Sequence, residues 1–444
     1  YADDVSIRLI TDHIRSATFM ISDGIMPTNE GRGYVLRRLI RRAARHGRLL
    51  GIKGTFLAKL SAEVINGSKA GYPELEEKKE FIFKVLTNEE NQFNKTIDQG
   101  LRILSDMEEE MKAAGENTLS GENAFKLYDT YGFPLDLTKE ILEEKGLTLD
   151  EERFMELMKN QKLTARANQS FKGGWDDAAA DALSGLKTTF VGYKELSCET
   201  KIIAMLKDGA LTDSIDEDND VAVVTETTPF YAESGGQVGD KGTITSAGGD
   251  NVLEVIDTKK IGGGQFVCYC RCLQGSFMTG DAVTATVDKE LRMATARNHT
   301  CAHLLQAALR SVLGDHVHQA GSYVDPYRCR FDFSHFSAVT PDELAQIEAL
   351  VNKEILAAVP VVTEELPIEE AKKKGAMALF GEKYGDVVRV VSMGDFSVEF
   401  CGGTHVSNTG VISALKIISE TGVAAGVRLI EALTSKGLLK YYDE

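Results

Sequence analysis

Two pairs of metal-ligating side chains stand far apart in this sequence, and both pairs have the same spacing. His299 and His303 are one helical turn apart, so a helix would place both imidazoles on one face. Cys401 and His405 repeat this spacing downstream. Either pair alone is a weak signal, because a histidine on a helix is more often a polar side chain satisfied by hydrogen bonds than a metal ligand. Together, one thiolate and three imidazoles are enough for tetrahedral zinc, so we predict a Zn²⁺ site at these residues.

Two other metal chemistries compete with this interpretation. A zinc protease of the His-Glu-x-x-His type needs a glutamate directly after its first histidine as general base, and here that position is Thr300. The cysteines Cys268, Cys270 and Cys272 alternate along a β-like run. Alternate residues of a strand point in parallel from one face, which is poor geometry for chelating one ion. We therefore interpret these cysteines as strand residues.

An arginine-rich helix is predicted near the start of the chain, over residues 32–48. Its arginines are Arg32, Arg37, Arg38, Arg41, Arg42, Arg45 and Arg48. Positions 37, 41, 45 and 48 share one helical face, where like charges repel unless anions offset them. A phosphate backbone is one suitable partner, because arginine contacts phosphate in a bidentate manner. The alternatives are a solvated face or ion pairs with the acidic helix of residues 76–110, and the sequence leaves them open.

Composition sets the broad class of the protein. The chain has 444 residues, a net charge of −17, and 43% hydrophobic and 26% charged residues, so we expect two or three ordinary globular domains. The negative charge argues mildly against a general polyanion binder, although nucleic acid responds to local patches. No stretch resembles a membrane span or a secretory signal. An odd number of dispersed cysteines favours a reducing compartment, so we expect a cytoplasmic protein.

The periodicity of apolar residues changes along the chain and predicts its organisation. Residues 1–169 have helical spacing, and residues 170–185 form a small-residue linker. Residues 186–290 are rich in short β-like runs, and residues 291–444 alternate helices with strands. The predicted fold class is multidomain, with an all-α module followed by an α+β region. That region comprises a β-rich, barrel-like subdomain and an α/β zinc-binding subdomain.

The run of residues 22–43 closely resembles the segment that follows the catalytic domain of alanyl-tRNA synthetases. The resemblance implies that this helical module recognises a G·U wobble pair in the acceptor stem of tRNA(Ala), through Asn29 and Asp129. An amide can donate and accept, and a carboxylate can accept from the exocyclic amine of guanine. Asp136 is the second choice for the carboxylate. Without the resemblance, Asn29 would be interpreted as a helix cap.

Both metal-ligating pairs match the editing domain of the same family. The resemblance extends to residues 233–240, 318–322 and 423–428, in the family's order, and covers nearly the whole chain. One departure is Ala302, where the family often has threonine. The resemblance implies hydrolysis of Ser or Gly wrongly attached to tRNA(Ala), on an internal fragment that lacks the aminoacylation core and the C-terminal domain. We therefore expect ATP and alanine sites to be absent and tRNA charging not to occur.

Roles for single residues follow from that hydrolase hypothesis. Zn²⁺ would act as a Lewis acid, or, with four protein ligands, as a structural ion. Gln319 would orient water or substrate, and loss of Cys401 would abolish hydrolysis. The loop Gly235, Gly236 and Gln237 would let backbone approach the substrate in the editing pocket. The alternatives are a non-catalytic tRNA-binding fragment with structural zinc, and a general metallohydrolase that the basic helix argues against.

Overall fold

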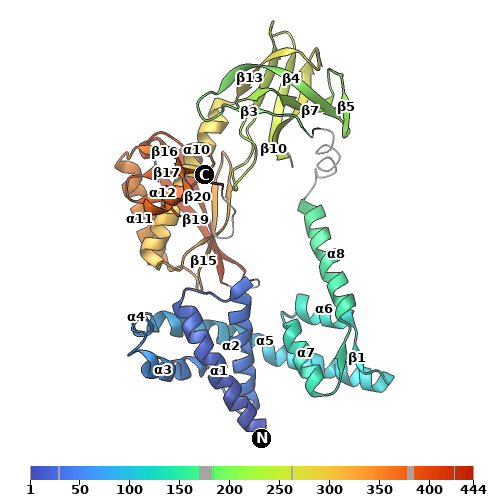
Figure 1. Cartoon of the computed structure of the whole chain (residues 1–444), viewed down its shortest axis with the longest axis vertical. Helices are drawn as coiled ribbons and strands as arrows, with labels where there is room; N and C mark the ends of the chain where they lie inside the picture. The colour runs from blue at the N-terminus through green and yellow to red at the C-terminus, as the bar shows by residue number, and fades with distance from the viewer. Residues whose placement is uncertain are drawn as a thin grey trace. The chain divides into compact units, whose positions relative to one another are not determined.

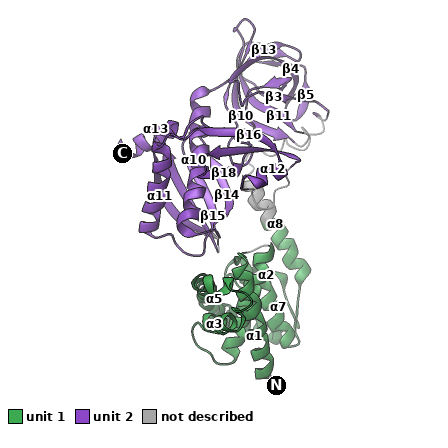
Figure 2. Ribbon diagram, turned by 60° about the vertical axis from the view of Figure 1, so that its left-hand side comes forward, with its two compact units in different colours: residues 1–171 green, residues 172–444 purple. Residues whose placement is uncertain are grey.

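The computed structural model describes residues 2–28, 31–169, 183, 185–261, 264–377, 385–424 and 426–443. The chain divides into two compact units, residues 1–171 and residues 172–444 (Figure 2). The predicted linker, residues 170–185, lies outside the described residues except for Leu183 and Gly185. Among the helices of the described residues, none has the length and apolar character that crossing a membrane requires.

The first unit is helical because its segments each carry one apolar stripe. Its elements are α1 (Ala2–Ser22), α2 (Gly31–Leu49), α3 (Leu57–Ser68), α4 (Glu74–Glu77), α5 (Lys79–Ala114), α6 (Gly121–Asp129), α7 (Leu135–Glu144) and α8 (Glu151–Gln169), with a parallel pair of short strands, β1 (Thr118–Leu119) and β2 (Thr148–Leu149). Leu36 of α2 and Phe93 of α5 are fully buried, and α2 packs against both α1 and α5. The core of this unit therefore forms around α2 (Figure 1).

The acidic helix of this unit differs from its prediction. The sequence predicts one acidic helix over residues 76–110, but Lys78 separates α4 from α5. α5 then runs unbroken to Gly115, whose φ of 73° is the left-handed C-cap conformation that glycine adopts without strain. Two acidic residues of this long helix are buried: Glu89 contacts arginines of α2, and Glu90 accepts hydrogen bonds from the backbone N–H of Phe56 and Leu57 at the start of α3.

The second unit begins with an antiparallel barrel. Its sheet consists of β4 (Ser197–Lys207), β5 (Ala210–Thr212), β7 (Asp220–Thr225), β9 (Gly242–Ser246), β10 (Val252–Ile261), β11 (Gln265–Gln274) and β13 (Ala282–Val287). The strand order is β13-β9-β10-β11-β7-β4-β5, and β13 also pairs with β4, which closes the sheet. Small pairs flank it: β3 (Thr189–Phe190) with β8 (Thr227–Thr228), and β6 (Ser214–Asp216) with β12 (Ser276–Met278). Closure leaves few free strand edges.

The three alternating cysteines confirm the strand interpretation. Cys268, Cys270 and Cys272 lie on β11 and are buried in the apolar core of the barrel. Burial raises the pKa of Cys268 to about 12, so its thiol stays neutral. A neutral, buried thiol behaves as a small apolar side chain, and the barrel core uses these cysteines in that way.

The remainder of the second unit packs two sheets around a long central helix. These elements are α10 (Lys289–Leu313), β14 (Gln319–Val324), β15 (Cys329–Ser334), α11 (Pro341–Leu356), β16 (Val361–Pro367), α12 (Ile368–Lys373), β17 (Val387–Met393), β18 (Ser397–Phe400), η1 (Thr409–Ile412), β19 (Leu415–Ala424), β20 (Val427–Thr434) and α13 (Ser435–Asp443). The sheet orders are β14-β15-β20-β19 and β16-β17-β18, and all pairs in them are antiparallel. The central helix α10 is buried over most of its length, including both predicted ligand positions.

Local sequence signals fix where these helices begin. Asp288 caps α10 by accepting a hydrogen bond from the backbone N–H of Leu291 at 3.0 Å. Thr340 and Glu343 form a reciprocal capping box at the start of α11. A buried ion pair between Arg292 of α10 and Asp240 joins this helix to the barrel. These contacts hold α10, and with it the two histidines, in one position.

Candidate metal centre and the arginine helix

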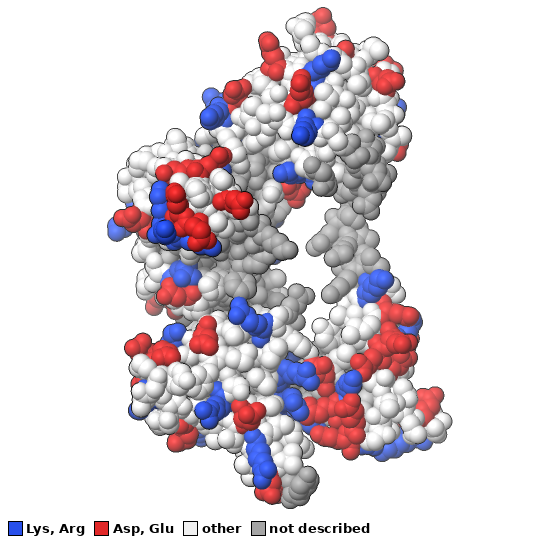
Figure 3. Space-filling model, viewed as in Figure 1, with Lys and Arg blue, Asp and Glu red and all other residues white. Residues whose placement is uncertain are grey.

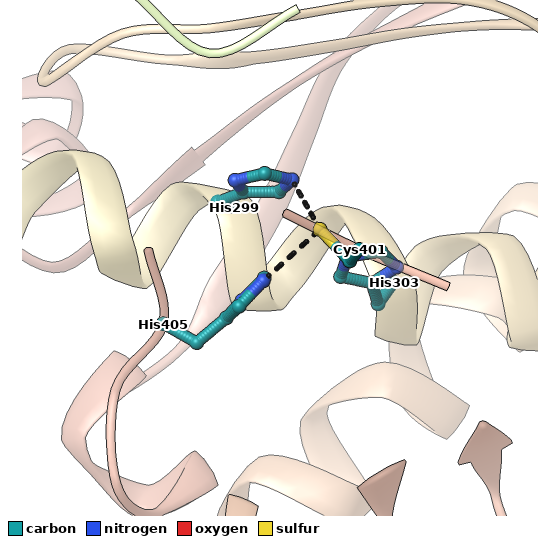
Figure 4. Close-up of side chains that lie close together, drawn as sticks. All are labelled: His299, His303, Cys401 and His405. Carbon is teal, nitrogen blue, oxygen red and sulfur yellow. Dashed lines mark hydrogen bonds between the residues drawn. The ribbon is translucent and has the colours of Figure 1, made fainter. Parts of the chain in front are cut away.

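The four predicted metal ligands converge at one place in the second unit. Their donor atoms all lie within 4.8 Å of one another. Nε2 of His299 lies 3.5 Å and Nε2 of His405 lies 3.2 Å from Sγ of Cys401 (Figure 4). His299 and His303 come from α10, whereas Cys401 and His405 come from the loop after β18. The prediction that the two distant pairs form one cluster capable of binding a metal ion is confirmed.

Each histidine of the cluster has an outer partner on its other ring nitrogen. Nδ1 of His299 lies 2.7 Å from Oε1 of Gln237, and Nδ1 of His303 lies 2.5 Å from Oε2 of Glu399. Both oxygens can only accept, so both Nδ1 atoms carry the proton. The opposite nitrogen, Nε2, is then the one with a free lone pair, which is the form of histidine that binds a metal.

His405 follows the same rule through a hydroxyl. The hydroxyl of Thr300 donates to the backbone carbonyl of Ala296 at 2.8 Å. Because its proton is used there, Oγ1 of Thr300 accepts from Nδ1 of His405, 3.1 Å away. All three imidazoles therefore present Nε2 to the cluster. The spacing of the ligands carried no signal for these outer partners, because Gln237, Glu399 and Thr300 reach the site only through packing.

The fit of a metal ion rests on one nitrogen in particular. Nε2 of His303 is buried and has no hydrogen-bond partner among the described residues. A buried nitrogen acceptor without a partner is unfavourable by about 1–3 kcal/mol. A cation coordinated by the four donors would satisfy this atom. The donor set, one thiolate and three neutral imidazoles, is one that zinc favours.

Electrostatics and backbone geometry prepare Cys401 as a thiolate. Burial opposes its ionisation, but the positive charge of the neighbouring histidines in their protonated form outweighs burial and holds the pKa of Cys401 well below its usual value. A metal cation would supply that positive charge when the imidazoles are neutral. The backbone N–H of Gly403 also donates to its sulfur at 3.3 Å. A Cβ at Gly403 would lie 2.0 Å from Cε1 of His299, so only glycine allows this approach. Arg389 holds the same loop by donating to the carbonyls of Cys401 and Gly403, each at 2.8 Å.

A cavity of about 370 Å³ opens beside the cluster. Gly235 and Gln319, predicted for an editing pocket and for catalysis, both line it, as do Cys401 and two of the histidines. Gly236 packs against the backbone of Ser322, where a Cβ would lie 2.3 Å from the carbonyl oxygen. Gln237 is fully buried and contacts His299 and Thr404. This loop therefore joins the cavity wall to a candidate metal ligand.

The arginines of α2 are paired with carboxylates inside the helical unit. The nitrogen–oxygen distances are 3.3 Å for Arg37–Glu89, 2.7 Å for Arg41–Glu89, 3.0 Å for Arg42–Glu140, 2.5 Å for Arg45–Glu144 and 3.7 Å for Arg48–Asp98. The side chains of Arg37 and Arg45 are each only 6% exposed. Of the alternatives left open by the sequence, ion pairing accounts for these arginines, with partners on α7 as well as α5. Basic and acidic side chains lie side by side over this unit (Figure 3).

The remaining predicted tRNA contacts lie at the edge of the helical unit. Arg32 is exposed, and Arg38 is half exposed and 3.9 Å from Asp136. Asp129 ends α6, is exposed, and accepts a hydrogen bond from Gln161 at 2.6 Å. Asn29 lies outside the described residues. Among the described members of the predicted set, Arg32, Arg38 and Asp129 are exposed.

Comparisons with known proteins place the chain among tRNA synthetases. The model of "tRNA synthetases class II (A)" matches residues 1–291, and that of the "Threonyl and Alanyl tRNA synthetase second additional domain" matches residues 388–431. "Alanine--tRNA ligase 1" of Lachnoclostridium phytofermentans is 59% identical over 442 residues, 99% of this chain and 50% of the relative. The alanine–tRNA ligases of Acetivibrio thermocellus and Clostridioides difficile are each 53% identical over 444 and 446 residues, covering 99% and 100% of this chain. The chain spans about half the length of these relatives.

These matches correct the predicted identity and fold class. The chain was expected to be an internal fragment outside the aminoacylation core, but the class II synthetase model matches it from residue 1 to residue 291. The expected absence of ATP and alanine sites rested on the absence of that core, so this expectation is wrong as well. An all-α recognition module followed by an editing region is likewise wrong, because the matched region includes the antiparallel sheet of the barrel. Apolar periodicity depends on the local backbone conformation, so it can distinguish a helix from a strand. It cannot show which region of a protein family a segment belongs to.

The predicted function is corrected on the same findings. Hydrolysis of mischarged tRNA, with a non-catalytic tRNA-binding fragment as its alternative, was inferred from the metal cluster and its surroundings. The matching family is instead that of the class II synthetases, and the relatives are ligases. These matches give no support to the hydrolytic roles predicted for Gln319 and Cys401. The structure does place Gln319 and Cys401 in the wall of one cavity, beside the candidate metal cluster.

Proposed function

Because the chain belongs to the class II tRNA synthetases, we propose that it forms part of an alanine–tRNA ligase, which joins alanine to tRNA(Ala) in the cytoplasm. The observation that carries the proposal is the 59% identity to such a ligase across 442 residues. The matched length covers both units, so the proposal includes the helical unit and the metal cluster. The proposed partner is tRNA(Ala), and ATP and alanine are the proposed small substrates.

A chimeric ligase tests this proposal. The half of the Lachnoclostridium phytofermentans ligase that matches this chain is replaced by residues 1–444, and attachment of alanine to tRNA(Ala) is measured. We expect kcat/KM within about tenfold of the parent, a difference of about 1.4 kcal/mol. Threonine and tRNA(Thr) serve as the control substrates and should give no product. A folded chimera that charges tRNA(Thr), or none at all, would contradict the proposal.

We further propose that His299, His303, Cys401 and His405 bind one Zn²⁺. Four protein ligands complete a tetrahedral shell, which is typical of a structural site, so the ion would fix the loop after β18 to α10. The ring-nitrogen arrangement and the low pKa of Cys401 support this assignment. The test is metal content by mass spectrometry on the purified chain and on Cys401→Ser. About one zinc per chain, lost in the variant, is expected; equal content in both would refute the site.

For tRNA recognition we propose Asn29 and Asp129 as base-reading residues, with Arg32 and Arg38 on the phosphate backbone. Support comes from the exposure of Asp129, Arg32 and Arg38. Asp129→Asn should weaken binding to tRNA(Ala) by about 1–3 kcal/mol if the carboxylate reads guanine. A tRNA(Ala) whose wobble pair is replaced by G·C should bind this variant as tightly as it binds the unmodified chain. A uniform loss on both tRNAs would show a role other than base reading.

A further inference from the structure

The loop after β18, which carries Cys401, is held by side chains at three successive backbone carbonyls. Nη1 of Arg389 donates to the carbonyl oxygens of Cys401 and Gly403, each at 2.8 Å. The phenol hydroxyl of Tyr193 donates to the carbonyl oxygen of Gly402, between them, at 2.5 Å. Carbonyls outside helices and sheets need such partners, and here all three partners come from outside the loop.

The two donors also contact each other. The guanidinium carbon of Arg389 lies 4.2 Å from the centroid of the Tyr193 ring, a cation–π contact. Arg389 lies on β17, and its own backbone carbonyl accepts from the N–H of Cys401 at 3.0 Å. Each donor therefore restricts the orientation of the other, and we call this pair of side chains the clamp.

The clamp connects the metal-bearing loop to the barrel. Tyr193 lies between β3 and β4, and the ring of Phe190 contacts it edge to face, with 4.9 Å between the ring centroids. The carbonyl of the preceding residue, Gly192, accepts from Nη1 of Arg292 at 2.6 Å. A Cβ at Gly192 would lie 2.1 Å from the carbonyl oxygen of Pro229, so this turn is closely packed. Tyr193 is thus fixed on the barrel side before it reaches the loop.

The hydroxyl of Tyr193 acts on the same peptide group that contacts the sulfur of Cys401. The carbonyl of Gly402 and the N–H of Gly403 belong to one planar peptide unit. That N–H donates to Sγ of Cys401 at 3.3 Å. Fixing the oxygen therefore fixes the direction of the N–H, and a hydrogen bond accepted by the oxygen strengthens the one that the N–H donates.

We propose that Tyr193 and Arg389 are positioning residues for the metal-binding thiolate. Tyr193 aims the Gly402–Gly403 peptide N–H at the sulfur, Arg389 holds the carbonyls on either side, and together they slow the release of the ion. The inference rests on the zinc site proposed above. It adds a barrel residue that contacts none of the four ligand side chains to the determinants of metal binding.

Release of zinc from the full chain tests the clamp, measured with excess chelator and a chromogenic zinc indicator. Tyr193→Phe keeps the ring on Arg389 and loses only the hydroxyl, so release should become about fivefold faster. Arg389→Met loses two hydrogen bonds and the cation–π contact, and release should become about tenfold faster or more. These changes are of the size that partners outside the ligand shell produce.

The Co²⁺-substituted chain gives a readout that lost packing alone would not change. Loss of a hydrogen bond raises the energy of the sulfur lone pairs, so the sulfur-to-cobalt charge-transfer band of Tyr193→Phe should move to longer wavelength. Faster zinc release without this shift would overturn the role of Tyr193 at the sulfur. Unchanged release in both clamp variants would overturn the clamp as a whole.

Matched controls remove the same groups elsewhere in the second unit. Tyr441→Phe removes the hydroxyl of a tyrosine of α13 that is 46% exposed, as Tyr193 is. Arg271→Met removes an exposed arginine of β11 that pairs with Asp220. Both controls should release zinc as the unmodified chain does, and an equal acceleration in them would contradict a specific clamp.

The clamp and the zinc site can fail separately. If the unmodified chain binds zinc and the clamp variants release it at the same rate, only the clamp falls. If the unmodified chain binds neither zinc nor cobalt, the zinc site falls, and hydrogen exchange of residues 401–406 then decides the role of Tyr193. Faster exchange in Tyr193→Phe would still show that the hydroxyl positions the loop, whereas equal exchange would overturn that as well.

Discussion

The helices α2 and α10 each carry a cluster of one kind of side chain, arginine on α2 and histidine on α10. The two clusters differ in how far their polar atoms are paired with other residues of the fold. On α2, buried arginines meet carboxylates of α5 and α7, and the charges cancel within the unit. On α10, Nδ1 of both histidines is hydrogen-bonded, and the buried Nε2 of His303 has no hydrogen-bond partner among the described residues. A cluster thus indicates a ligand only where the surrounding residues leave donor atoms unsatisfied.

The largest effect in this comparison is expected at Glu89, which is 5% exposed and contacts both Arg37 and Arg41. Glu89→Ala would leave two poorly solvated guanidinium groups without a carboxylate. We expect a loss of about 3–5 kcal/mol in the free energy of unfolding of the helical unit. Urea unfolding followed by circular dichroism measures it. Glu76→Ala, at an exposed pair on α4, is the matched control and should change little; similar losses in both would contradict internal neutralisation of α2.

The metal centre should be sensitive to its outer partners in a different way. Glu399→Gln keeps an acceptor for His303 but removes the charge that makes the imidazole a better ligand. We expect zinc affinity to fall by about 10- to 100-fold, measured by competition with a chromogenic chelator. Glu364→Gln, on an exposed stretch of β16, should leave affinity unchanged. Unchanged affinity in Glu399→Gln would mean that the carboxylate only packs against the ring.

A pH-dependent effect of intermediate size is expected at Glu140 of α7. Burial raises its pKa, but hydrogen bonds from His46 and Arg42 and the charges of Arg42 and Arg45 outweigh burial and lower the pKa to about 2. The unfolded value is about 4.3, so the ionised carboxylate stabilises the fold above that pH, and the stabilisation disappears as pH falls toward 2.

This prediction is tested by comparing the chain with Glu140→Gln at several pH values. Because the carboxylate is partly solvated, the difference in unfolding free energy at pH 6 should be about 1 kcal/mol after allowance for screening. It should shrink steadily between pH 5 and pH 3. A difference that stays constant over this range would indicate lost packing instead of lost charge.

The smallest effect is expected at Arg38, which is half exposed and 3.9 Å from Asp136. Arg38→Ala should change stability by less than about 0.5 kcal/mol, because exposed pairs contribute little. The same variant should nevertheless weaken binding of tRNA(Ala), measured by anisotropy. If Arg38→Ala lowered stability and left tRNA binding unchanged, the proposal that exposed arginines of α2 bind tRNA while buried ones stabilise the fold would be contradicted.

The residue types and local periodicity already determined several features of this protein. The spacing of His299–His303 and of Cys401–His405 identified a cluster that could bind a metal ion, although only the first pair lies on a helix. The alternation of Cys268, Cys270 and Cys272 identified a core strand. The arginine-rich helix predicted over residues 32–48 is α2, which runs from Gly31 to Leu49. All of these features depend on residues that are close together in the sequence.

Tertiary structure decided which side chains satisfy one another. Glu89, Glu140, Gln237 and Glu399 are far in sequence from the groups they contact, so no local pattern pairs them. Pair energies depend on distance and burial, and both are set only when the core packs. The sequence therefore determined the chemical groups, and packing determined which of them are neutralised and which remain free to bind a ligand.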